Sequence, residues 1–118
     1  MWIYLNDAFL SIVAHWEDEE VLLVRARRQS DIERVFPGAE VEETPTADYR
    51  FRATLPRHAV ADAIAATVTG ITYPNFKASV TDRDRHDAYL DVWGIMRRRS
   101  VRLACLVVRQ LCMINNTK

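Results

Sequence analysis

The sequence predicts an α+β fold in which a mostly antiparallel sheet of four or five strands carries two or three helices on one face. Segments rich in aromatic and β-branched residues precede the first helical pattern, and a strictly alternating segment separates later helices. The chain has 118 residues, of which 49% are hydrophobic. It is therefore long enough for one compact domain to bury its own core.

Three strands are expected first. Residues 2–5 and 8–15 flank the turn-forming pair Asn6-Asp7, which predicts a hairpin. An acidic loop at 17–20 precedes a third strand at 21–27. These three predicted strands come before any helical pattern, so we expect the N-terminal region to form the first part of the sheet.

A capping box then predicts a helix of two turns. In Ser30-Asp31-Ile32-Glu33 the hydroxyl of Ser30 and the carboxylate of Glu33 would satisfy each other's exposed amides. Pro37-Gly38 ends that helix. Residues 40–43 predict a weak, acidic edge strand.

The clearest strand spans 49–55, because its polar and apolar residues alternate strictly. The alternation places Tyr49, Phe51, Ala53 and Leu55 on one face and Arg50, Arg52 and Thr54 on the other. A helix follows from Pro56 in its first turn to Gly70, which is expected to be a left-handed stop. Residues 76–80 predict one or two helical turns.

Thr81 or Asp82 is expected to cap a last helix. Its predicted stripe consists of His86, Tyr89, Leu90, Trp93 and Met96. We expect residues 1–96 to form a single α+β domain and 97–118 to form a helical extension, first basic and then apolar. Because apolar residues surround most of 101–114, this segment packs in its own core, forms a homo-oligomer or docks on a partner protein.

The 16 basic and 16 acidic residues cancel, but they are unevenly placed. Residues 97–118 carry six basic side chains and no acidic one, so the body before them has a net charge of −6. Such a division suits contact with nucleic acid, contact with an acidic protein, or contact of tail with body.

Cys105 and Cys112 lie seven residues apart in a predicted helix, too far along its axis to form a disulfide with each other. Few cysteines, no recognisable signal peptide and no apolar run of about 20 residues predict a cytoplasmic protein without a membrane span.

Four arginines on two strands are candidate binding residues: Arg25, Arg27, Arg50 and Arg52. If the strands are neighbours, their guanidinium groups line an anion-binding groove. The alternative is a solvated sheet face on which they pair with Glu40, Glu42 or Glu43.

The loop residues Tyr73, Asn75 and Lys77 are further candidates, because loops on a rigid scaffold often carry recognition. The alternative is that Tyr73 and Phe76 anchor the loop in the core, Asn75 caps the next turn and Lys77 is exposed.

His86 is a candidate general base oriented by Asp87, or a metal ligand beside Asp82. The alternative is a half-buried histidine beside Tyr89, among acids favoured by the helix dipole. A metal site needs three or four converging ligands, and the sequence predicts neither a metal site nor a cofactor. No signature assigns catalytic residues.

Arg97, Arg98 and Arg99, followed by Arg102, form a basic run. They are candidates for neutralising nucleic-acid phosphates, although no nucleic-acid-binding motif accompanies them. The alternative is a solvated helix face.

Several short segments carry a resemblance to a group of short bacterial and phage-borne proteins of uncharacterised activity. They are MWI at 1–3, VRAR at 24–27, DIE at 31–33, DYRFRA at 48–53, ITYPNFK at 71–77 and HDAYLDVW at 86–93. The resemblance covers roughly residues 1–96, and the rest looks like an addition to the pattern. It implies a free-standing intracellular module and no catalytic residue.

The favoured hypothesis is a small non-catalytic protein-interaction module. One version is a stoichiometric inhibitor or modulator of a larger complex, such as a phage-borne anti-defence or anti-CRISPR protein. The alternatives are a nucleic-acid or phosphate-ligand binding protein that uses the arginine clusters, and a small enzyme that uses His86 and the Tyr73–Lys77 loop.

Overall fold

The computed structural model describes the backbone of residues 1–115, and the side chains of these residues except those of 103 and 107–115. The chain divides into two compact units, Met1–Ser79 and Val80–Lys118. The first unit contains an antiparallel sheet with helices, so the predicted α+β fold is confirmed.

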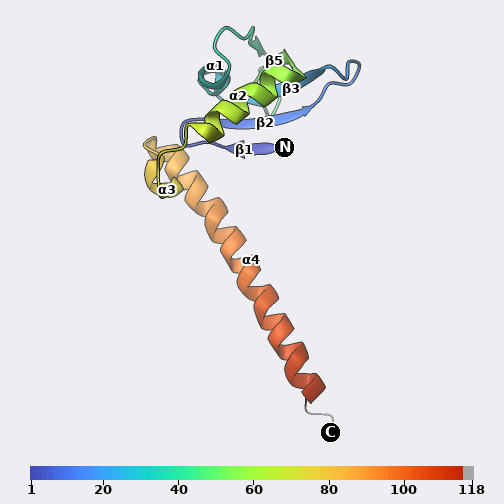
Figure 1. Ribbon diagram of the computed structural model, residues 1–118, viewed down its shortest axis with the longest axis vertical. Helices are drawn as coiled ribbons and strands as arrows, with labels where there is room; N and C mark the ends of the chain where they lie inside the picture. Colours follow the sequence, from blue (N-terminus) through green and yellow to red (C-terminus); the bar gives the residue numbers. More distant parts are fainter. Residues whose placement is uncertain (116–118) are drawn as a thin grey trace. The chain divides into compact units, whose positions relative to one another are not determined.

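The sheet has five strands in the order β1-β2-β3-β5-β4, and every neighbouring pair is antiparallel (Figure 1). Their bounds are β1 Trp2–Tyr4, β2 Phe9–Ala14, β3 Val21–Ala26, β4 Glu42–Glu43 and β5 Phe51–Pro56. The first three strands follow one another as in a meander. β5 then pairs with β3, and the short acidic strand β4 forms the edge, as predicted.

The helices are α1 Gln29–Val35, α2 Arg57–Thr69, α3 Phe76–Ser79 and α4 Arg83–Asn115. The helix α4 continues without a break across positions 96 and 97. Within the described residues, no helix is both long enough and apolar enough to span a membrane.

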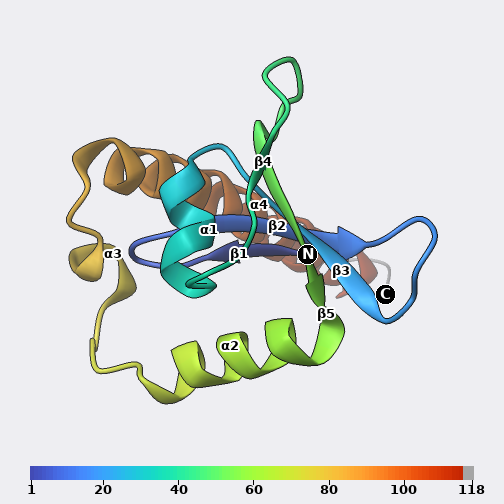
Figure 2. The same cartoon turned by 90° about the horizontal axis from the view of Figure 1, so that it is seen from above.

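The core of the first unit lies between one face of the sheet and the helices α1 and α2 (Figure 2). Alternate strand residues point into it, among them Leu10, Val24 and Ala53, each 2% exposed or less. Ile32 of α1 and Val60 of α2 belong to the same cluster. The alternation predicted for Phe51, Ala53 and Leu55 is confirmed, since all three pack in or against this core.

The predicted capping box does not form. The N-cap residue of α1 is Arg28, no side chain caps the helix, and Ser30 lies inside the first turn. The side chain of Glu33 instead accepts a hydrogen bond from Nε2 of Gln29 at 2.7 Å. Buried Asp31 accepts a hydrogen bond from the backbone N–H of Phe9 at 3.1 Å. This tie between α1 and the start of β2 helps to set where the helix begins.

The two glycines that were predicted to end helices, Gly38 and Gly70, adopt different backbone conformations. Gly38 has φ of +82°, so the Pro37-Gly38 end of α1 uses the left-handed region that glycine favours. Gly70 has φ of −83° and ψ of 4°, so the left-handed stop predicted there is wrong. Its N–H donates to the carbonyl of Ala66, which closes α2 with an ordinary backbone conformation.

In the second unit Asp82, rather than Thr81, caps α4, because its Oδ1 accepts a hydrogen bond from the N–H of Arg85 at 2.9 Å. The predicted stripe along α4 is buried only in part. Tyr89 is 8% exposed, but Trp93 is 48% and Met96 64% exposed.

Candidate functional site

One sheet face carries three of the four candidate arginines of the first unit. We call the face opposite α1 and α2 the arginine face; Ser11, Arg25, Arg27 and Arg52 lie on it, whereas Arg50 lies just before β5 and pairs with Glu43. The strand register places Arg25 opposite Ser11 on one side and opposite Arg52 on the other. The strands that carry the arginines are therefore neighbours, as the groove hypothesis requires.

The ring of Tyr49 lies between two of these guanidinium groups. The Cζ of Arg25 is 4.8 Å from the ring centroid and the Cζ of Arg27 is 4.6 Å from it. Tyr49 thus belongs to the arginine face, and its predicted place beside Phe51 and Ala53 is wrong. The backbone bends at 47–49 and β5 begins only at Phe51, so the strand alternation does not extend back to position 49.

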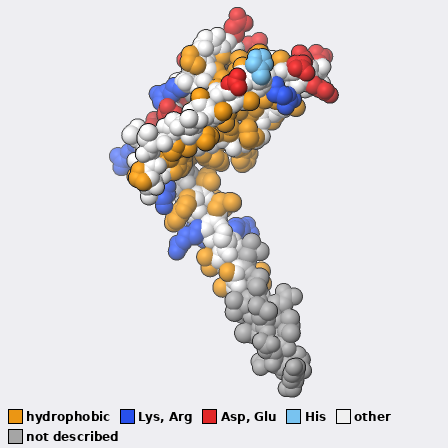
Figure 3. All heavy atoms as spheres, in the orientation of Figure 1, with side chains coloured by type: hydrophobic (Ala, Val, Ile, Leu, Met, Phe, Trp, Pro, Cys, Tyr) orange, Lys and Arg blue, Asp and Glu red, His pale blue; other side chains and the backbone are white. Residues whose placement is uncertain are grey.

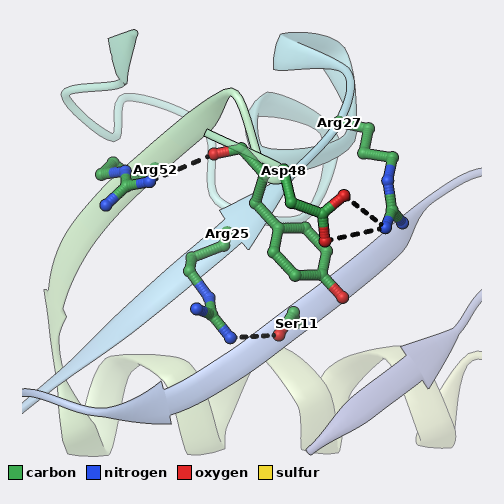
Figure 4. Close-up of polar contacts among 6 residues, drawn as sticks. Ser11, Arg25, Arg27, Asp48 and Arg52 are labelled. Carbon is green, nitrogen blue, oxygen red and sulfur yellow. Dashed lines mark hydrogen bonds and ion pairs between the residues drawn. The ribbon is translucent and has the colours of Figure 1, made fainter. Parts of the chain in front are cut away.

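Of the four arginines, two form ion pairs within the described residues and two form none there. Arg27 binds the carboxylate of Asp48 at 3.0 and 3.2 Å (Figure 4), and Nε of Arg50 donates to Glu43 at 2.6 Å. Arg25 and Arg52 contact no carboxylate within the described part of the chain.

The contacts of Arg25 and Arg52 are to uncharged groups (Figure 4). Arg25 donates from Nη2 to the Ser11 hydroxyl at 2.8 Å, and Arg52 donates from Nη2 to the Tyr49 carbonyl at 3.2 Å. Pairing with the acidic edge strand, the alternative drawn from the sequence, therefore accounts for Arg50 alone.

Aromatic side chains continue the arginine face across β1 and β2. Trp2 and Tyr4 lie on the same face as Phe9, with ring centroids 6.5 and 4.8 Å from it. Arg27 approaches the Phe9 ring at 5.9 Å. Trp2 is 65% exposed, so a flat apolar surface borders the arginines.

A cavity of about 510 Å³ in the first unit is lined by none of the residues of the arginine face. The β1–β2 turn, the ends of α1 and α2, and the segment up to Tyr73 line it. Arg34 at its rim donates to the backbone carbonyl of Asp7 at 3.3 Å. The volume falls in the usual range for small-molecule sites. Tyr73 is the one predicted binding residue that lines it.

The other loop candidates, Asn75 and Lys77, do not line this cavity. Asn75 accepts a hydrogen bond from the N–H of Ala78 at 3.1 Å, so it caps α3, as its second interpretation predicts. The rings of Tyr73 and Phe76 lie 6.0 Å apart. Lys77 is half-buried within α3.

His86 belongs to the second unit, whereas Tyr73 and Lys77 belong to the first. Nδ1 of His86 lies 3.4 Å from Oδ1 of Asp87, its neighbour in the chain. Among the described residues, no three histidine, cysteine or acidic side chains gather closely enough to hold a metal ion. The enzymatic hypothesis stays a prediction.

The arginine run Arg97, Arg98 and Arg99 lies on the exposed surface of α4. The Cζ of Arg97 is 5.7 Å from the Trp93 ring centroid. Figure 3 shows both apolar and basic side chains on the surface of the described part of this helix. Cys105 is exposed, whereas the side chains of Cys112 and Arg109, like Lys118, lie outside the described residues.

Sequence reasoning missed Ser11 and Tyr49 as parts of the site. Ser11 is 1% exposed within the apolar strand β2, and a polar residue in such a strand is a signal of a buried hydrogen bond. Tyr49 gave no such signal, because its position depends on the bend before β5.

Comparison with protein-family models, curated proteins and solved structures gives no match to this chain. The candidate functions therefore depend on the residues and their geometry alone.

Proposed function

We propose that the protein is a non-catalytic protein-interaction module that associates with a second copy of itself through α4. The observation that carries this proposal is a stripe of large apolar side chains exposed on that helix. We define the apolar stripe as Val92, Trp93, Ile95, Met96 and Leu106, which are between 37% and 64% exposed.

Helix geometry places these residues together. At 100° per residue, Val92, Ile95, Met96 and Leu106 fall within an arc of about 100°, and Trp93 borders it. Arg99 falls inside the same arc, so the stripe is interrupted by one arginine. A stripe of this width is typical of a helix that packs against another element. Val101 is 55% exposed but lies outside the arc.

The charges along α4 favour a second copy in the antiparallel orientation. Residues 82–91 contain four aspartates and two arginines, whereas 97–102 contain four arginines and no acid. Two such helices side by side in opposite directions bring the acidic part of each level with the basic part of the other. In this orientation the positive end of each helix dipole also lies beside the negative end of the other, which is favourable. A surface that complements itself produces a closed dimer.

The energetic contribution of each stripe residue is modest. Full burial of a Val, Ile, Leu or Met side chain contributes about 1.5–3 kcal/mol, so burying the exposed half contributes about 1 kcal/mol. Removing two such side chains from both copies therefore costs about 4 kcal/mol. That loss weakens the dimer by roughly a thousandfold.

The test compares two double variants of the full chain by sedimentation velocity. Val92→Gln with Met96→Gln removes the centre of the apolar stripe while keeping side chains that favour helix. Val68→Gln with Val101→Gln is the matched control, because it also replaces two exposed apolar side chains by glutamine, one on α2 and one on α4 outside the arc. We expect the stripe variant to be monomeric and the control to associate like the unmodified protein.

Equal association of both variants would contradict the proposal. A stoichiometric modulator of a larger complex would use the apolar stripe on a different partner. For such a protein, the unmodified chain would stay monomeric at every concentration, which would overturn self-association.

A further inference from the structure

The arginine face contains a pair of guanidinium groups without a carboxylate partner. We propose that Arg25 and Arg52 together bind a phosphate group. This site lies in the first unit and does not depend on the association of α4.

The register gives the first step of the argument. Arg25 of β3 lies directly opposite Arg52 of β5, and both side chains point away from the core, since their neighbours Val24 and Ala53 point into it. Like charges directly opposite each other destabilise a sheet. The two guanidinium groups turn apart, toward Ser11 and toward the Tyr49 carbonyl (Figure 4), and an anion that both bind would offset the repulsion and draw them together.

The unused hydrogen-bonding capacity gives the second step. A guanidinium group has five N–H donors, and each of these two makes one hydrogen bond in the described part of the chain. In both, the buried Nε has no hydrogen-bond partner among the described residues. Both side chains are half-buried, so they are partly desolvated and yet accessible.

The surroundings hold the pair in place. Ser11 fixes the Nη2 group of Arg25, and the Tyr49 carbonyl fixes that of Arg52. The Tyr49 ring supports Arg25 from one side at 4.8 Å. Ser11 and Tyr49 are 1% and 9% exposed, so these supports are rigid parts of the fold. These hydrogen bonds hold the two guanidinium groups toward different partners (Figure 4), so a phosphate shared by both requires a side-chain rotation that replaces a bond to an uncharged group with one to the anion.

Charge and shape favour phosphate over carboxylate. One guanidinium fork satisfies the two oxygens and single charge of a carboxylate. Two forks on adjacent strands offer two positive charges and donors for more than two oxygens, which suits a phosphate. Glu42, opposite Arg52 on β4, forms no ion pair within the described residues and would repel the anion.

Free phosphate esters and nucleic-acid backbones present the same chemical group. Trp2 lies in the same cross-strand row, two strands from Arg25, so their backbones are about 10 Å apart across the sheet, and Trp2 is exposed. A base could stack there if the phosphate belongs to a single-stranded nucleic acid.

The experiment titrates the full chain with inorganic phosphate, and separately with a short oligothymidylate, at low salt and neutral pH. The arginine Nε–H signals in ¹H–¹⁵N spectra report binding at the two guanidinium groups. We expect phosphate to shift the signals of Arg25 and Arg52. Arg25→Gln and Arg52→Gln should each weaken binding about tenfold or more.

The matched controls are Arg27→Gln and Arg50→Gln. Each removes the same charge from the same sheet, but from a guanidinium already paired with a carboxylate. We expect less than about a threefold loss from each. Glu42→Gln should tighten binding, because it removes a neighbouring negative charge. Each of the two substitutions also removes one structural hydrogen bond, to Ser11 or to the Tyr49 carbonyl, so circular dichroism checks folding first, and if one variant fails to fold the other is decisive.

The outcomes separate the sources and the alternatives. If Trp2→Ala weakens the binding of oligothymidylate but not that of inorganic phosphate, the natural ligand is a nucleic acid. If the unmodified protein and the Trp2→Ala variant bind both ligands with the same affinity, the natural ligand is a free phosphate group. Either result supports the site. The proposal is overturned if neither ligand binds, if all four arginine variants lose affinity equally, or if acetate shifts the same signals as strongly as phosphate.

Discussion

Replacing Tyr49 by leucine should destabilise the first unit by about 2–3 kcal/mol. The ring lies 4.8 Å from Cζ of Arg25 and 4.6 Å from Cζ of Arg27, and Tyr49 is 9% exposed. A cation–π contact contributes about 0.5–1 kcal/mol at an exposed site and about 2 kcal/mol when desolvated. Arg27 is exposed and Arg25 half-buried, so the two contacts together give the expected loss.

Urea unfolding followed by circular dichroism measures the effect. A loss of this size lowers the urea midpoint by roughly 1–2 M. Tyr49→Phe is the control: it keeps the ring, and the Tyr49 hydroxyl makes no hydrogen bond in the described part of the chain. We expect the phenylalanine variant to stay within about 0.5 kcal/mol of the unmodified protein.

A double-mutant cycle with Arg25→Met isolates the contact between Arg25 and the Tyr49 ring. The coupling free energy should be about 1 kcal/mol or more, because the two groups touch directly. The reasoning is refuted if Tyr49→Leu and Tyr49→Phe lose the same stability, or if the coupling is zero. In that case the hydroxyl or simple burial, rather than the arginines, would determine the role of Tyr49.

Other substitutions test the backbone and the core. Gly38→Ala should cost about 1–2 kcal/mol because φ is +82°, although a Cβ would meet no atom within 4 Å. Gly70→Ala should instead stabilise by about 0.4–1 kcal/mol, since φ is −83° and a Cβ would make only ordinary contact with Ala66 at 3.4 Å; thermal unfolding of both variants shows whether the signs are opposite. Leu10→Ala should cost about 2–5 kcal/mol in urea unfolding, because the side chain is fully buried, whereas Trp16→Ala at a 75% exposed position should change stability by less than about 0.5 kcal/mol. A similar loss from both would show that the described core is wrong.

The fold class and the element types could be predicted because they depend on local patterns. Alternation in 49–55 predicted a strand and, from Phe51 onward, its buried face, and the Asn6-Asp7 turn predicted the first hairpin. The hydrogen bond from Leu5 N–H to the Ala8 carbonyl at 2.8 Å closes that turn.

Features that depend on distant residues could not be predicted. Residues 30–33 have the sequence of a capping box, but the box does not form. Asp31, within these residues, instead accepts a hydrogen bond from the N–H of Phe9 in β2, 22 residues away. The pairing of β3 with β5 brings Arg25 opposite Arg52, and no local pattern states which strands are neighbours. The position of Tyr49 could not be predicted either, because the bend at 47–49, and not the strand alternation, determines on which face of the sheet its side chain lies.

The candidate site could be predicted only in part. The sequence identified all four sheet arginines, but the division into two paired and two unpaired groups required the positions of Asp48 and Glu43. Along α4, helical spacing predicted the stripe of Tyr89, Trp93 and Met96. Spacing does not state what covers an apolar face, and Trp93 and Met96 prove to be exposed.

Sedimentation equilibrium of the unmodified full chain across a wide concentration range tests self-association through α4 most directly. One chain has a mass of 13.6 kDa. We predict a reversible rise to about 27 kDa, the mass of two chains, as the concentration increases. A constant mass of one chain at every concentration would contradict the account.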